Sequence, residues 1–499
     1  MAGGMKTLAK ETLFYGMGSV LPKLLSWLLS LYWAFALPKV SDIGILTNFY
    51  AWVALLQVIL TYGMETGFFK FANDEKDPAR VFSTTFISIL TTTILFFAAS
   101  SIFVKPLAFA LGGIDLKPHY LLLLIIILCV DVIATIPFAS LRFKKRPIRF
   151  ALIKMINVVL TIVLNLFFFL LCPILKSMYP NAFDWFDLSR GVDFILISNL
   201  AASVVQLLLV SPELKIRFSF DWPLLKRILK YSFPILILGI AGILNQTVDK
   251  IIFPKIYPDA SKAFTELGIY GQNFKIAIIM VMFTQAFRYA FEPYIFARNR
   301  GGSDDKQSFS DATKYFIIFG LLIFLGTTGF IDIIKFMIPA KYYAGLKVVP
   351  IVLLGELFFG VYFNLSLWYK LTDQTKWGAY MSVFGFIITI TINIAFIPKF
   401  GYMACAWASF FANLIMMIIS YLVGQKKYPV PYNLKSAATF FSLSMILFAG
   451  ITASLMYIPN LWLRLIISAI AIIIYIAVIV KKELPLKDWP IVGRYFSRP

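Results

Sequence analysis

Histidine and cysteine are scarce in this chain, whose 499 residues include one histidine, His119, and three cysteines. The cysteines, Cys129, Cys172 and Cys405, are scattered, and each falls inside an apolar run. They therefore form neither a disulfide framework nor a metal site. A single histidine leaves almost nothing for histidine-based catalysis or metal binding, so we expect no metal and no bound cofactor.

Charge is also scarce, because only 14% of the residues are charged while 60% are hydrophobic and the mean hydropathy is +0.83. Soluble domains carry about 25% charged residues. The net charge of +21 would suggest nucleic acid, but the basic residues lie in short loops, where they set orientation and meet anionic lipid headgroups. The composition predicts a polytopic membrane protein and excludes nucleic-acid binding.

Long apolar runs are abundant. Each is near the ~20 residues that a helix needs to cross a bilayer, and none shows the short alternating segments of a β-barrel. We therefore predict an all-α polytopic membrane protein with about 14 transmembrane helices. The runs lie at about 12–37, 44–71, 81–104, 119–141, 150–173, 192–211, 231–254, 267–297, 315–338, 348–371, 378–397, 403–423, 437–457 and 461–480.

Lysine and arginine fall mainly on one side of these spans. With the N-terminus inside, the inner connections hold 30 of the 46 basic residues, the outer ones hold 13, and Lys23, Lys275 and Arg288 lie within spans. The imbalance predicts that both termini are cytoplasmic. The segment RFKKRPIR at 142–149 is either the strongest topological anchor or a basic patch for a partner. No outer connection exceeds about eighteen residues, which is too short for a catalytic domain.

A short sequence pattern occurs in both halves of the chain, and we call this internal repeat the internal echo. LPKVSDIGI at 37–45 is matched by FPKI at 253–256 and ELGIY at 266–270. The spans that follow each end on an acid among aromatic residues, in YGMETGFFKFA at 62–72 and FRYAFEPYIFA at 287–297. The pattern indicates two pseudo-symmetric six-helix repeats, whose interface is the usual substrate site of a transporter.

The echo predicts three domains. An N-terminal lobe of spans one to six occupies 1–230, and a C-terminal lobe of spans seven to twelve occupies 231–424. The remaining residues, 425–499, form a helix pair and a cytoplasmic tail.

Cations within spans are the first candidates for a site. A charge at the bilayer centre costs about 2.5–3.5 kcal/mol, so it usually faces a protein interior or a water-filled cavity. Lys23 lies midway along the first span, too deep to reach the interface easily by snorkelling. Arg288 and Glu292 lie one helical turn apart and could neutralise each other, which leaves Lys275 unexplained. The predicted cavity cations are Lys23, Lys250, Lys275 and Arg288.

Acids within spans are candidates for coupling. Asp131 lies near the middle of the fourth span, and burial there favours the protonated carboxyl group, as a proton relay requires. A hydrogen bond to a nearby Thr or Asn is the alternative. Glu65 pairs either with Lys70 or with a charge across the bundle. The candidate coupling or ion-pair residues are Asp131, Glu65, Glu292 and Asp249.

Several segments, taken together, carry a family resemblance. The chain resembles the polysaccharide biosynthesis family, the O-antigen-type lipid-linked oligosaccharide flippases of the multidrug/oligosaccharidyl-lipid/polysaccharide exporter superfamily. The order of the segments carries the likeness, and no single one is diagnostic. They are YGMGSVLPK at 15–23, YGMETGFFKF at 62–71, the passage from VDKIIFPK at 248–255 to ELGIYG at 266–271, YYAGLKVVPIVLLGELFFGVYFNLSLWYKL at 342–371, and INIAFIPKFGYMACAWAS at 392–409.

The resemblance implies two six-helix lobes around a cation-lined cavity and no enzymatic activity. It implies transport of an undecaprenyl-diphosphate oligosaccharide across the bacterial inner membrane, with membrane lipid and other polysaccharide assembly proteins as further partners. The predicted cations suit a diphosphate, which Arg binds bidentately and Lys as a point charge. Coupling to H+, to Na+ or to the membrane potential stays open.

Three other functions compete with this one. A cation-coupled antiporter of the multidrug-extrusion type would need acids in its cavity, whereas the mid-span charges include three cations. A lipid II flippase would use an arginine cluster, and this chain offers mainly lysines. An oligosaccharide polymerase or ligase would need a long outer loop with catalytic residues, which the short connections do not supply.

Overall fold

The computed structural model describes residues 21–113, 116–214, 219–300, 306–372, 374 and 376–483, except for the side chains of 290, 292–300 and 370. Within these ranges every regular element is helical, and thirteen helices are long and apolar enough to span a membrane. Residues 21–36 form a further helix, whose predicted span begins outside the described residues. The all-α polytopic fold with about 14 spans is confirmed.

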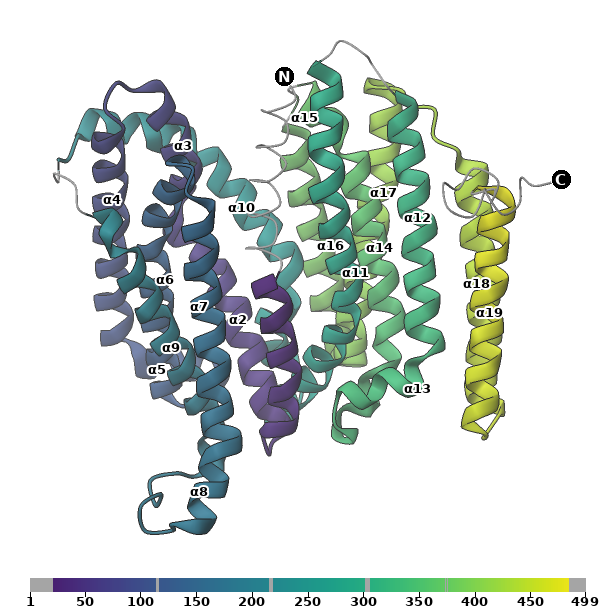
Figure 1. Ribbon diagram of the computed structural model, residues 1–499, viewed down its shortest axis with the longest axis horizontal. Helices are drawn as coiled ribbons and strands as arrows, with labels where there is room; N and C mark the ends of the chain where they lie inside the picture. The colour runs from purple at the N-terminus through teal and green to yellow at the C-terminus, as the bar shows by residue number, and fades with distance from the viewer. Residues whose placement is uncertain are drawn as a thin grey trace. The chain divides into compact units, whose positions relative to one another are not determined.

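The first half of the chain contains both long spanning helices and short connecting ones (Figure 1). Its α-helices are α2 (Val40–Thr61), α3 (Met64–Asp74), α4 (Pro78–Ile102), α5 (Val104–Gly112), α6 (Pro118–Phe143), α7 (Pro147–Leu166), α8 (Cys172–Met178), α9 (Gly191–Val210) and α10 (Trp222–Ile256). A π-helical stretch, η2 (Phe167–Leu171), joins α7 to α8, and the 3-10 helices are η3 (Leu188–Arg190) and η4 (Ser211–Leu214).

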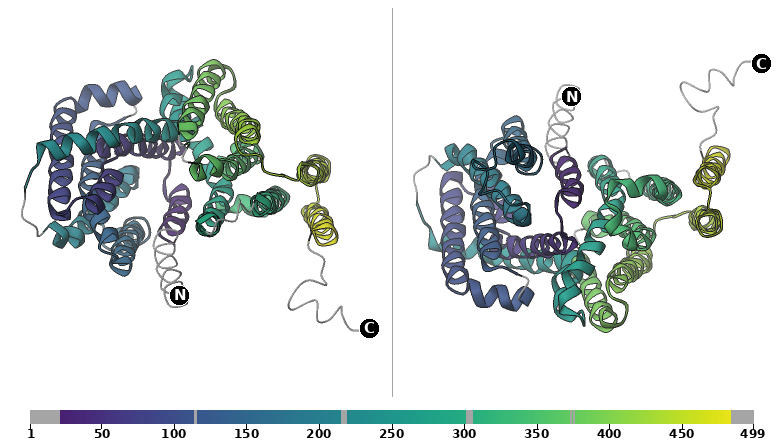
Figure 2. Two further views of the ribbon diagram at one scale, coloured as in Figure 1. Left: turned by 90° about the horizontal axis from the view of Figure 1, so that it is seen from above. Right: turned by 90° about the horizontal axis from the view of Figure 1, so that it is seen from below.

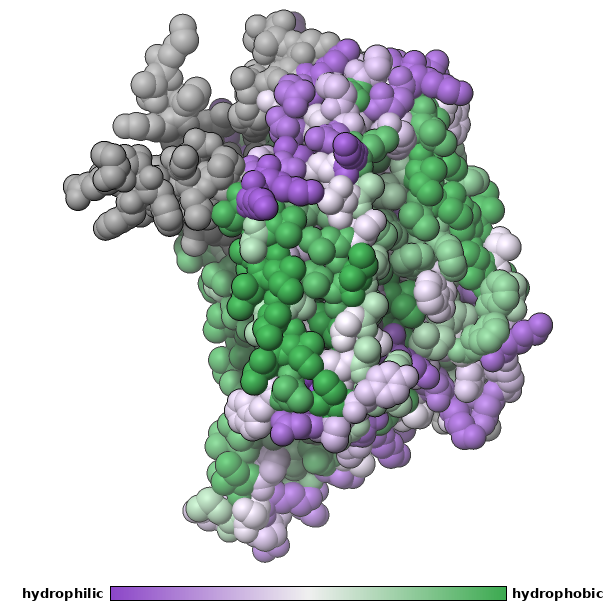
Figure 3. Space-filling view, turned by 90° about the vertical axis from the view of Figure 1, so that its right-hand side faces the viewer, coloured by the Kyte–Doolittle hydropathy of each residue, from purple (hydrophilic) through white to green (hydrophobic). Residues whose placement is uncertain are grey.

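The second half ends in a hairpin of two adjacent helices, which Figure 2 shows end-on. Its helices are α11 (Ala260–Arg300), α12 (Lys306–Gly329), α13 (Ile331–Ile334), η5 (Lys335–Met337), η6 (Ala340–Val348), α14 (Val349–Leu365), α15 (Leu367–Leu371), α16 (Lys376–Phe400), α17 (Tyr402–Lys427), α18 (Leu434–Tyr457) and α19 (Leu461–Lys482). The face turned to the viewer in Figure 3 carries a broad hydrophobic band with hydrophilic residues above and below it, as a spanning protein requires.

The helices group into two compact units. The N-terminal unit consists of the described parts of 1–272 with 389–405, and the C-terminal unit of those of 273–388 with 406–499. The sequence-predicted lobes, 1–230 and 231–424, stay a prediction.

Two glycines of the internal echo meet at a helix crossing in the N-terminal unit. A Cβ atom built on Gly44 of α2 would lie 1.8 Å from the carbonyl oxygen of Phe264, and one built on Gly268 of α11 would lie 2.3 Å from that of Val40. Each carbonyl is four residues before the partner helix's glycine, so the contact is reciprocal. Only glycine allows backbones this close. The two glycines that the internal echo repeats therefore allow α2 and α11 to pack closely at this crossing.

The second predicted span, 44–71, is interrupted in the structure. α2 ends at Thr61 and α3 begins at Met64, with left-handed backbone at Tyr62 (φ 32°) and Gly63 (φ 70°). Glycine adopts this conformation at little cost. A Cβ on Gly63 would also lie 2.9 Å from the carbonyl oxygen of Ser232. The sequence analysis missed this break, which redirects the helix just before Glu65.

The C-terminal helix pair is attached to the C-terminal unit at both of its ends. Near one end, Lys314 of α12 pairs with Glu483 at 2.9 Å. Near the other, Arg464 of α19 lies 3.1 Å from Asp332, a buried carboxylate. Between them, the Tyr475 hydroxyl donates to the Ile318 carbonyl at 3.1 Å. These contacts hold the last two spans against α12 and α13.

Candidate substrate-binding site

The N-terminal unit contains a polar cavity of about 440 Å3, open on one side, among its spanning helices. It is bounded by α2, α3, α6, α7 and α9, and acids, cations, amides and hydroxyl groups dominate its wall. The lining residues are Gln57, Glu65, Asp131, Thr135, Phe138, Arg142, Phe150, Lys154, Asn157, Ser203 and Gln206. A polar cavity of this size within spanning helices is large enough for a small-molecule group.

Helical periodicity places these side chains on common faces. Spacings of three and four residues align side chains along one face of a helix. α6 contributes four such positions, α7 three and α9 two, which are Asp131, Thr135, Phe138 and Arg142; Phe150, Lys154 and Asn157; and Ser203 and Gln206. The cavity therefore results from the polar stripes of three neighbouring helices.

Glu65 and Arg142 form an ion pair at the wall of the cavity. The carboxylate of Glu65 accepts from the guanidinium of Arg142, and both side chains keep over a third of their surface accessible, at 39% and 34%. The guanidinium carbon lies 5.2 Å from the ring centre of Phe69 and 5.7 Å from that of Phe150. Aromatic faces attract a cation in this way. Of the two partners expected for Glu65, the structure selects the charge across the bundle.

Lys154 and Asp131 form the second charged group of the cavity. The ammonium of Lys154 donates to the Gln206 amide oxygen at 3.2 Å and lies 4.2 Å from the ring centre of Phe138. Ser203 and Lys154 are polar neighbours of Asp131. With Glu65 and Arg142, the cavity wall holds two acids and two cations, so it offers both donors and acceptors at no net charge.

A polar stripe continues along α7 beyond the cavity. Thr161 donates to the Asn157 carbonyl at 2.9 Å, and Asn165 donates to the Thr161 carbonyl at 2.7 Å. The indole N–H of Trp33 donates to the side-chain oxygen of Asn165 at 2.8 Å. Asn165 is therefore a helix–helix contact, which is the commonest role of such residues in membranes.

Asp249 and Lys250 lie apart from the polar cavity and pair with each other. The Lys250 ammonium lies 3.1 Å from the Asp249 carboxylate, whose oxygen also accepts from the Tyr270 hydroxyl at 2.9 Å. Both charged side chains are largely buried, and the Asn48 amide donates to the Lys250 carbonyl at 2.7 Å. This group links α10 to α2 and α11.

Lys275 and Arg288 lie on α11, in the C-terminal unit. Lys275 is half-buried, and Arg288 places its guanidinium carbon 3.5 Å from the ring centre of Phe363. Thirteen residues separate them, which is about 20 Å along a helix and about 140° around it. α11 therefore does not bring these two cations together. The side chain of Glu292 lies outside the described residues.

Lys23 lies near the beginning of the described chain, in the helix formed by 21–36. Its side chain is exposed, whereas the preceding Pro22 is buried. Among the predicted site residues whose side chains the structure describes, Glu65 and Asp131 line one cavity. Asp249 and Lys250 are in direct contact with each other.

Arg142 and Lys154 are the cavity residues that the sequence analysis missed. Arg142 belongs to the basic segment 142–149 that follows the fourth predicted span. Lys154 lies near the start of the fifth predicted span and is counted with the same inner basic residues. The sequence nonetheless contains a signal for each. Arg142 lies eleven residues, or three helical turns, after Asp131 and so falls on the same helical face. Lys154 lies three residues before Asn157 and shares a face with it on α7. Extending the helical register past the apolar run would have found them.

The C-terminal unit contains a partly open cavity of about 330 Å3 whose wall is mainly apolar. It lies among α12, α14, α17 and the start of α18, and its wall is mainly aliphatic and aromatic. The lining residues are Ser310, Thr313, Lys314, Ile317, Val361, Leu365, Met417, Ile418, Tyr421, Tyr432, Asn433, Leu434 and Ala437. No cluster of three or more His, Cys, Asp or Glu residues that could hold a metal ion occurs in the part of the chain that the structure describes.

Comparison with known proteins adds a family and a fold. The family model described as "Polysaccharide biosynthesis protein" matches residues 8–298, and no curated protein is significantly similar in sequence. The solved structure "Lipid II flippase MurJ, inward closed conformation" is similar with a TM-score of 0.72 at 14% identity, covering 94% of this chain and 99% of that one.

Multidrug transporters have a similar fold. The structure titled "Inward-facing conformation of a multidrug resistance MATE family transporter of the MOP superfamily" gives a TM-score of 0.63 at 12% identity, covering 83% of this chain and 98% of that one. A third structure, "Crystal structure of MATE in the straight conformation", gives a TM-score of 0.53 at 13% identity, covering 85% of this chain and 95% of that one. At these identities the likeness establishes the fold alone.

Proposed function

Because the chain belongs to the polysaccharide biosynthesis protein family, whose fold it shares with flippases and multidrug transporters, we propose that it is a lipid-linked oligosaccharide flippase. Its cargo is a polyprenyl-diphosphate oligosaccharide, such as a repeat unit of O-antigen, capsule or exopolysaccharide. It works in the bacterial inner membrane, with both termini in the cytoplasm. The chain moves the cargo between leaflets without breaking a covalent bond, so it is not an enzyme.

The polar cavity of the N-terminal unit is the observation that carries this proposal. Ion pairs and amides among spanning helices are costly and usually mark a substrate or ion pathway. The wall combines Arg142 and Lys154 with carboxylates, amides and hydroxyl groups, which is the mixture of donors and acceptors that sugar hydroxyl groups need. The phenyl rings of Phe138 and Phe150 add apolar faces against which a sugar ring can pack.

The cargo divides chemically into three parts, and the proposal assigns each a place. Sugar residues enter the polar cavity, and the polyprenyl chain stays in the surrounding lipid. Cations hold the diphosphate, and Arg142 and Lys154 are the first candidates because they line this cavity. The predicted Lys23, Lys250, Lys275 and Arg288, which lie elsewhere, are candidates for contacts at other stages of transport. The two lobes alternate between inward and outward access, as repeat-built transporters do.

Coupling is assigned to the acids within the spans. Asp131, with its Ser203 and Lys154 neighbours, is the first candidate for binding H+ or Na+, followed by Glu65, Glu292 and Asp249. The membrane potential alone is the alternative drive, because it acts on a charged headgroup with about 2.3 kcal/mol per charge per 100 mV.

The test is reconstitution of the purified full chain into liposomes that hold a fluorescent polyprenyl-diphosphate oligosaccharide. A membrane-impermeant quencher reports the fraction of label in the outer leaflet. We expect the protein to accelerate exchange between leaflets, and Arg142→Gln with Lys154→Gln to abolish it. Exchange no faster than in protein-free liposomes, under H+ and Na+ gradients and an applied potential, would refute the proposal.

A multidrug antiporter is the second candidate, and two observations favour it. Glu65 and Asp131 supply the acids that a cationic drug needs, and multidrug transporters share the fold. The two activities separate in one experiment, in which cells expressing the protein are challenged with cationic dyes. Resistance that Asp131→Asn removes would establish the antiporter, and the flippase predicts none. A lipid II cargo is tested by substituting lipid II for the glycolipid in the same liposomes.

A further inference from the structure

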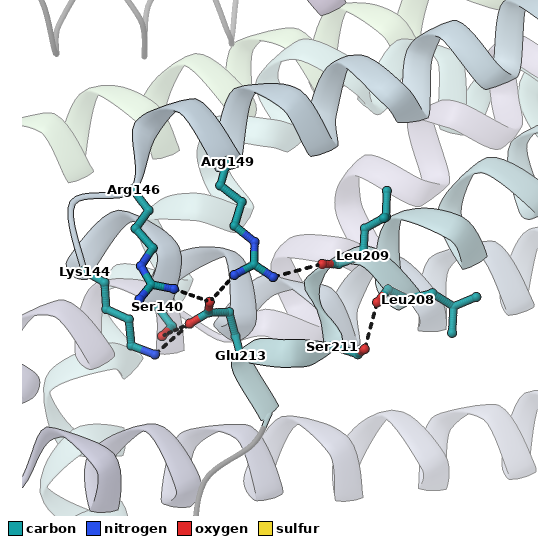
Figure 4. Close-up of polar contacts among 8 residues, drawn as sticks. All are labelled: Ser140, Lys144, Arg146, Arg149, Leu208, Leu209, Ser211 and Glu213. Carbon is teal, nitrogen blue, oxygen red and sulfur yellow. Dashed lines mark hydrogen bonds and ion pairs between the residues drawn. The ribbon is translucent and has the colours of Figure 1, made fainter.

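A buried carboxylate organises three cations at the end of α6, α7 and α9, as Figure 4 shows. Glu213 has only 2% of its side chain exposed. Its two oxygens lie 2.7 Å from the Lys144 ammonium, 3.4 Å from an Arg146 nitrogen and 3.1 Å from an Arg149 nitrogen. The Ser140 hydroxyl donates to it at 3.4 Å. We call the four charged residues, Glu213 and its three cations, the Glu213 cluster.

The backbone holds the three cations in place. Only three residues join Phe143, the last of α6, to Pro147, the first of α7. The Arg146 N–H donates to the Leu141 carbonyl at 3.0 Å, and Lys145 takes a left-handed conformation, with φ of 53°. The cations of the Glu213 cluster are therefore presented by a closed turn, and their positions do not depend on a long loop.

The cluster has more positive charge than its carboxylate neutralises. Three cations against one carboxylate leave two positive charges, and the cation side chains are 42%, 53% and 35% exposed. Arg149 makes one further contact, to the Leu209 carbonyl at 3.5 Å. Among the described residues, these contacts use fewer than half of the N–H groups that two guanidinium groups and one ammonium carry. The remaining donors can bind an anion.

Exposed apolar side chains continue from the cluster along the spanning helices. On α7, Ile148, Leu152 and Ile156 are 58%, 56% and 41% exposed at intervals of four residues. On α9, which packs against α7, Leu208 is 64% exposed and Val204 39%. Apolar side chains that face outward from a spanning helix contact hydrocarbon. Donors for an anion and a surface for acyl chains are thus adjacent on the same pair of helices.

We propose that the Glu213 cluster binds the phosphate headgroup of an anionic glycerophospholipid, whose acyl chains lie along Ile148 and Leu152. The predicted topology places the cluster in the cytoplasmic leaflet, which is rich in anionic lipid and where basic sites between helices bind such headgroups. Glu213 keeps the three cations together in the absence of lipid, because it reduces their mutual repulsion. The bound lipid bridges α7 and α9, the helices that carry Lys154 and Gln206 of the polar cavity.

Charge and position favour a resident phospholipid over a soluble anion. A soluble phosphate compound would use the donors but leave the apolar surface of α7 to other lipids. A phospholipid uses both, and it is always present in excess in the leaflet. The proposal does not depend on what the protein transports, so it can fail or succeed independently of the flippase assignment.

The test measures lipid binding to delipidated full-length protein by native mass spectrometry. The probes are dioleoyl phosphatidylglycerol and dioleoyl phosphatidylcholine, which have the same acyl chains and different net charge. We expect phosphatidylglycerol to bind at least tenfold more tightly. Arg146→Gln with Arg149→Gln should weaken it about 25-fold and leave phosphatidylcholine unchanged, because each basic residue contributes about fivefold near an anionic headgroup.

The control variant removes the same charge elsewhere. Lys226→Gln with Lys435→Gln alters two exposed lysines outside the Glu213 cluster and should leave both affinities unchanged. If the arginine variant does not fold, Lys144→Gln serves instead, with an expected loss of about fivefold. Equal binding of the two lipids, or an equal loss in the control variant, would overturn the proposal. Displacement of phosphatidylglycerol by equimolar farnesyl diphosphate would also overturn it, because the site would then belong to the carrier.

Discussion

Two cavities, one in each unit of the described chain, have similar volumes and walls of opposite polarity. The cavity of the N-terminal unit, about 440 Å3, is lined by two acids, two cations and several amides and hydroxyl groups. The cavity of the C-terminal unit, about 330 Å3, is lined mainly by aliphatic and aromatic side chains. The first can receive a polar group inside the membrane, and the second offers mainly apolar contacts.

The difference in polarity between the two cavity walls indicates which wall serves function and which only packing. Charged pairs within a membrane protein are costly to desolvate, and replacing such a pair with apolar residues is often neutral or stabilising. The ion pair of Glu65 with Arg142 and the neighbouring charges of Asp131 and Lys154 are therefore a poor means of holding helices together. An apolar cavity carries no such desolvation cost. We infer that the polar cavity is present for its ligand.

Reversing a charge in the polar cavity should have the largest effect. Lys154→Glu changes its wall from two acids and two cations to three acids and one cation, which repels a diphosphate. We expect leaflet exchange in proteoliposomes to fall more than 100-fold, which corresponds to about 2.7 kcal/mol. Lys226→Glu, an exposed lysine on α10, is the matched reversal and should change exchange less than twofold. If the Lys154→Glu protein folds and its rate of leaflet exchange lies within threefold of the rate of the unchanged protein, the account is contradicted.

Removing the cation of the Glu65 pair should have the next largest effect. We expect Arg142→Ala to slow exchange about 10-fold to 100-fold, because it removes a charge-assisted donor and leaves Glu65 without its cation. Ile317→Ala in the apolar cavity should leave exchange unchanged. The double variant Glu65→Ala, Arg142→Ala should have a higher melting temperature than the sum of the single losses predicts, since removing both partners leaves no unpaired charge. Additive losses would show that the two residues are not coupled.

Filling each cavity in turn should produce opposite results. Ser203→Leu narrows the polar cavity and removes a neighbour of Asp131, so we expect exchange to fall about tenfold. Ala437→Leu fills the apolar cavity and should raise the melting temperature by a few degrees with exchange unchanged. Equal loss of exchange in both variants would indicate that the cargo uses both cavities.

The smallest effect is expected at a neutral amide. Gln206→Ala removes the acceptor of the Lys154 ammonium but no charge, which costs about 1 kcal/mol for one hydrogen bond. We expect an approximately fivefold loss of exchange, measured in the same liposomes. Gln206→Glu restores an acceptor for Lys154 and should recover part of the loss. If Gln206→Glu folds normally and recovers none of the loss, Gln206 would instead contact the cargo directly.

The sequence predicted the helical fold well because the length of a hydrophobic run is a strong local signal. It missed the break at Tyr62 and Gly63, since a left-handed pair inside an apolar run changes direction without changing hydropathy. The internal echo was visible, but its cause required coordinates: Gly44 and Gly268 pack against each other's helix.

The site was harder to predict than the fold. Glu65 and Asp131 were found because each is an acid inside an apolar run. Their partners Arg142 and Lys154 were missed because they lie at the ends of runs, where a basic residue is normally a topological anchor. The helix bounds show that both cations lie within helices, because α6 continues to Phe143 and α7 begins at Pro147. Only the packing of α6, α7 and α9 shows that their polar stripes converge.

Substrate protection of an engineered cysteine in the polar cavity tests the account most directly. Ser203→Cys is introduced after the three native cysteines are replaced, and Ile317→Cys in the apolar cavity is the matched control. We predict that a water-soluble thiol reagent labels Ser203→Cys and not Ile317→Cys, and that the lipid-linked oligosaccharide slows the labelling at least tenfold. Labelling of Ser203→Cys at the same rate with and without the glycolipid would contradict the claim that the cavity receives the cargo.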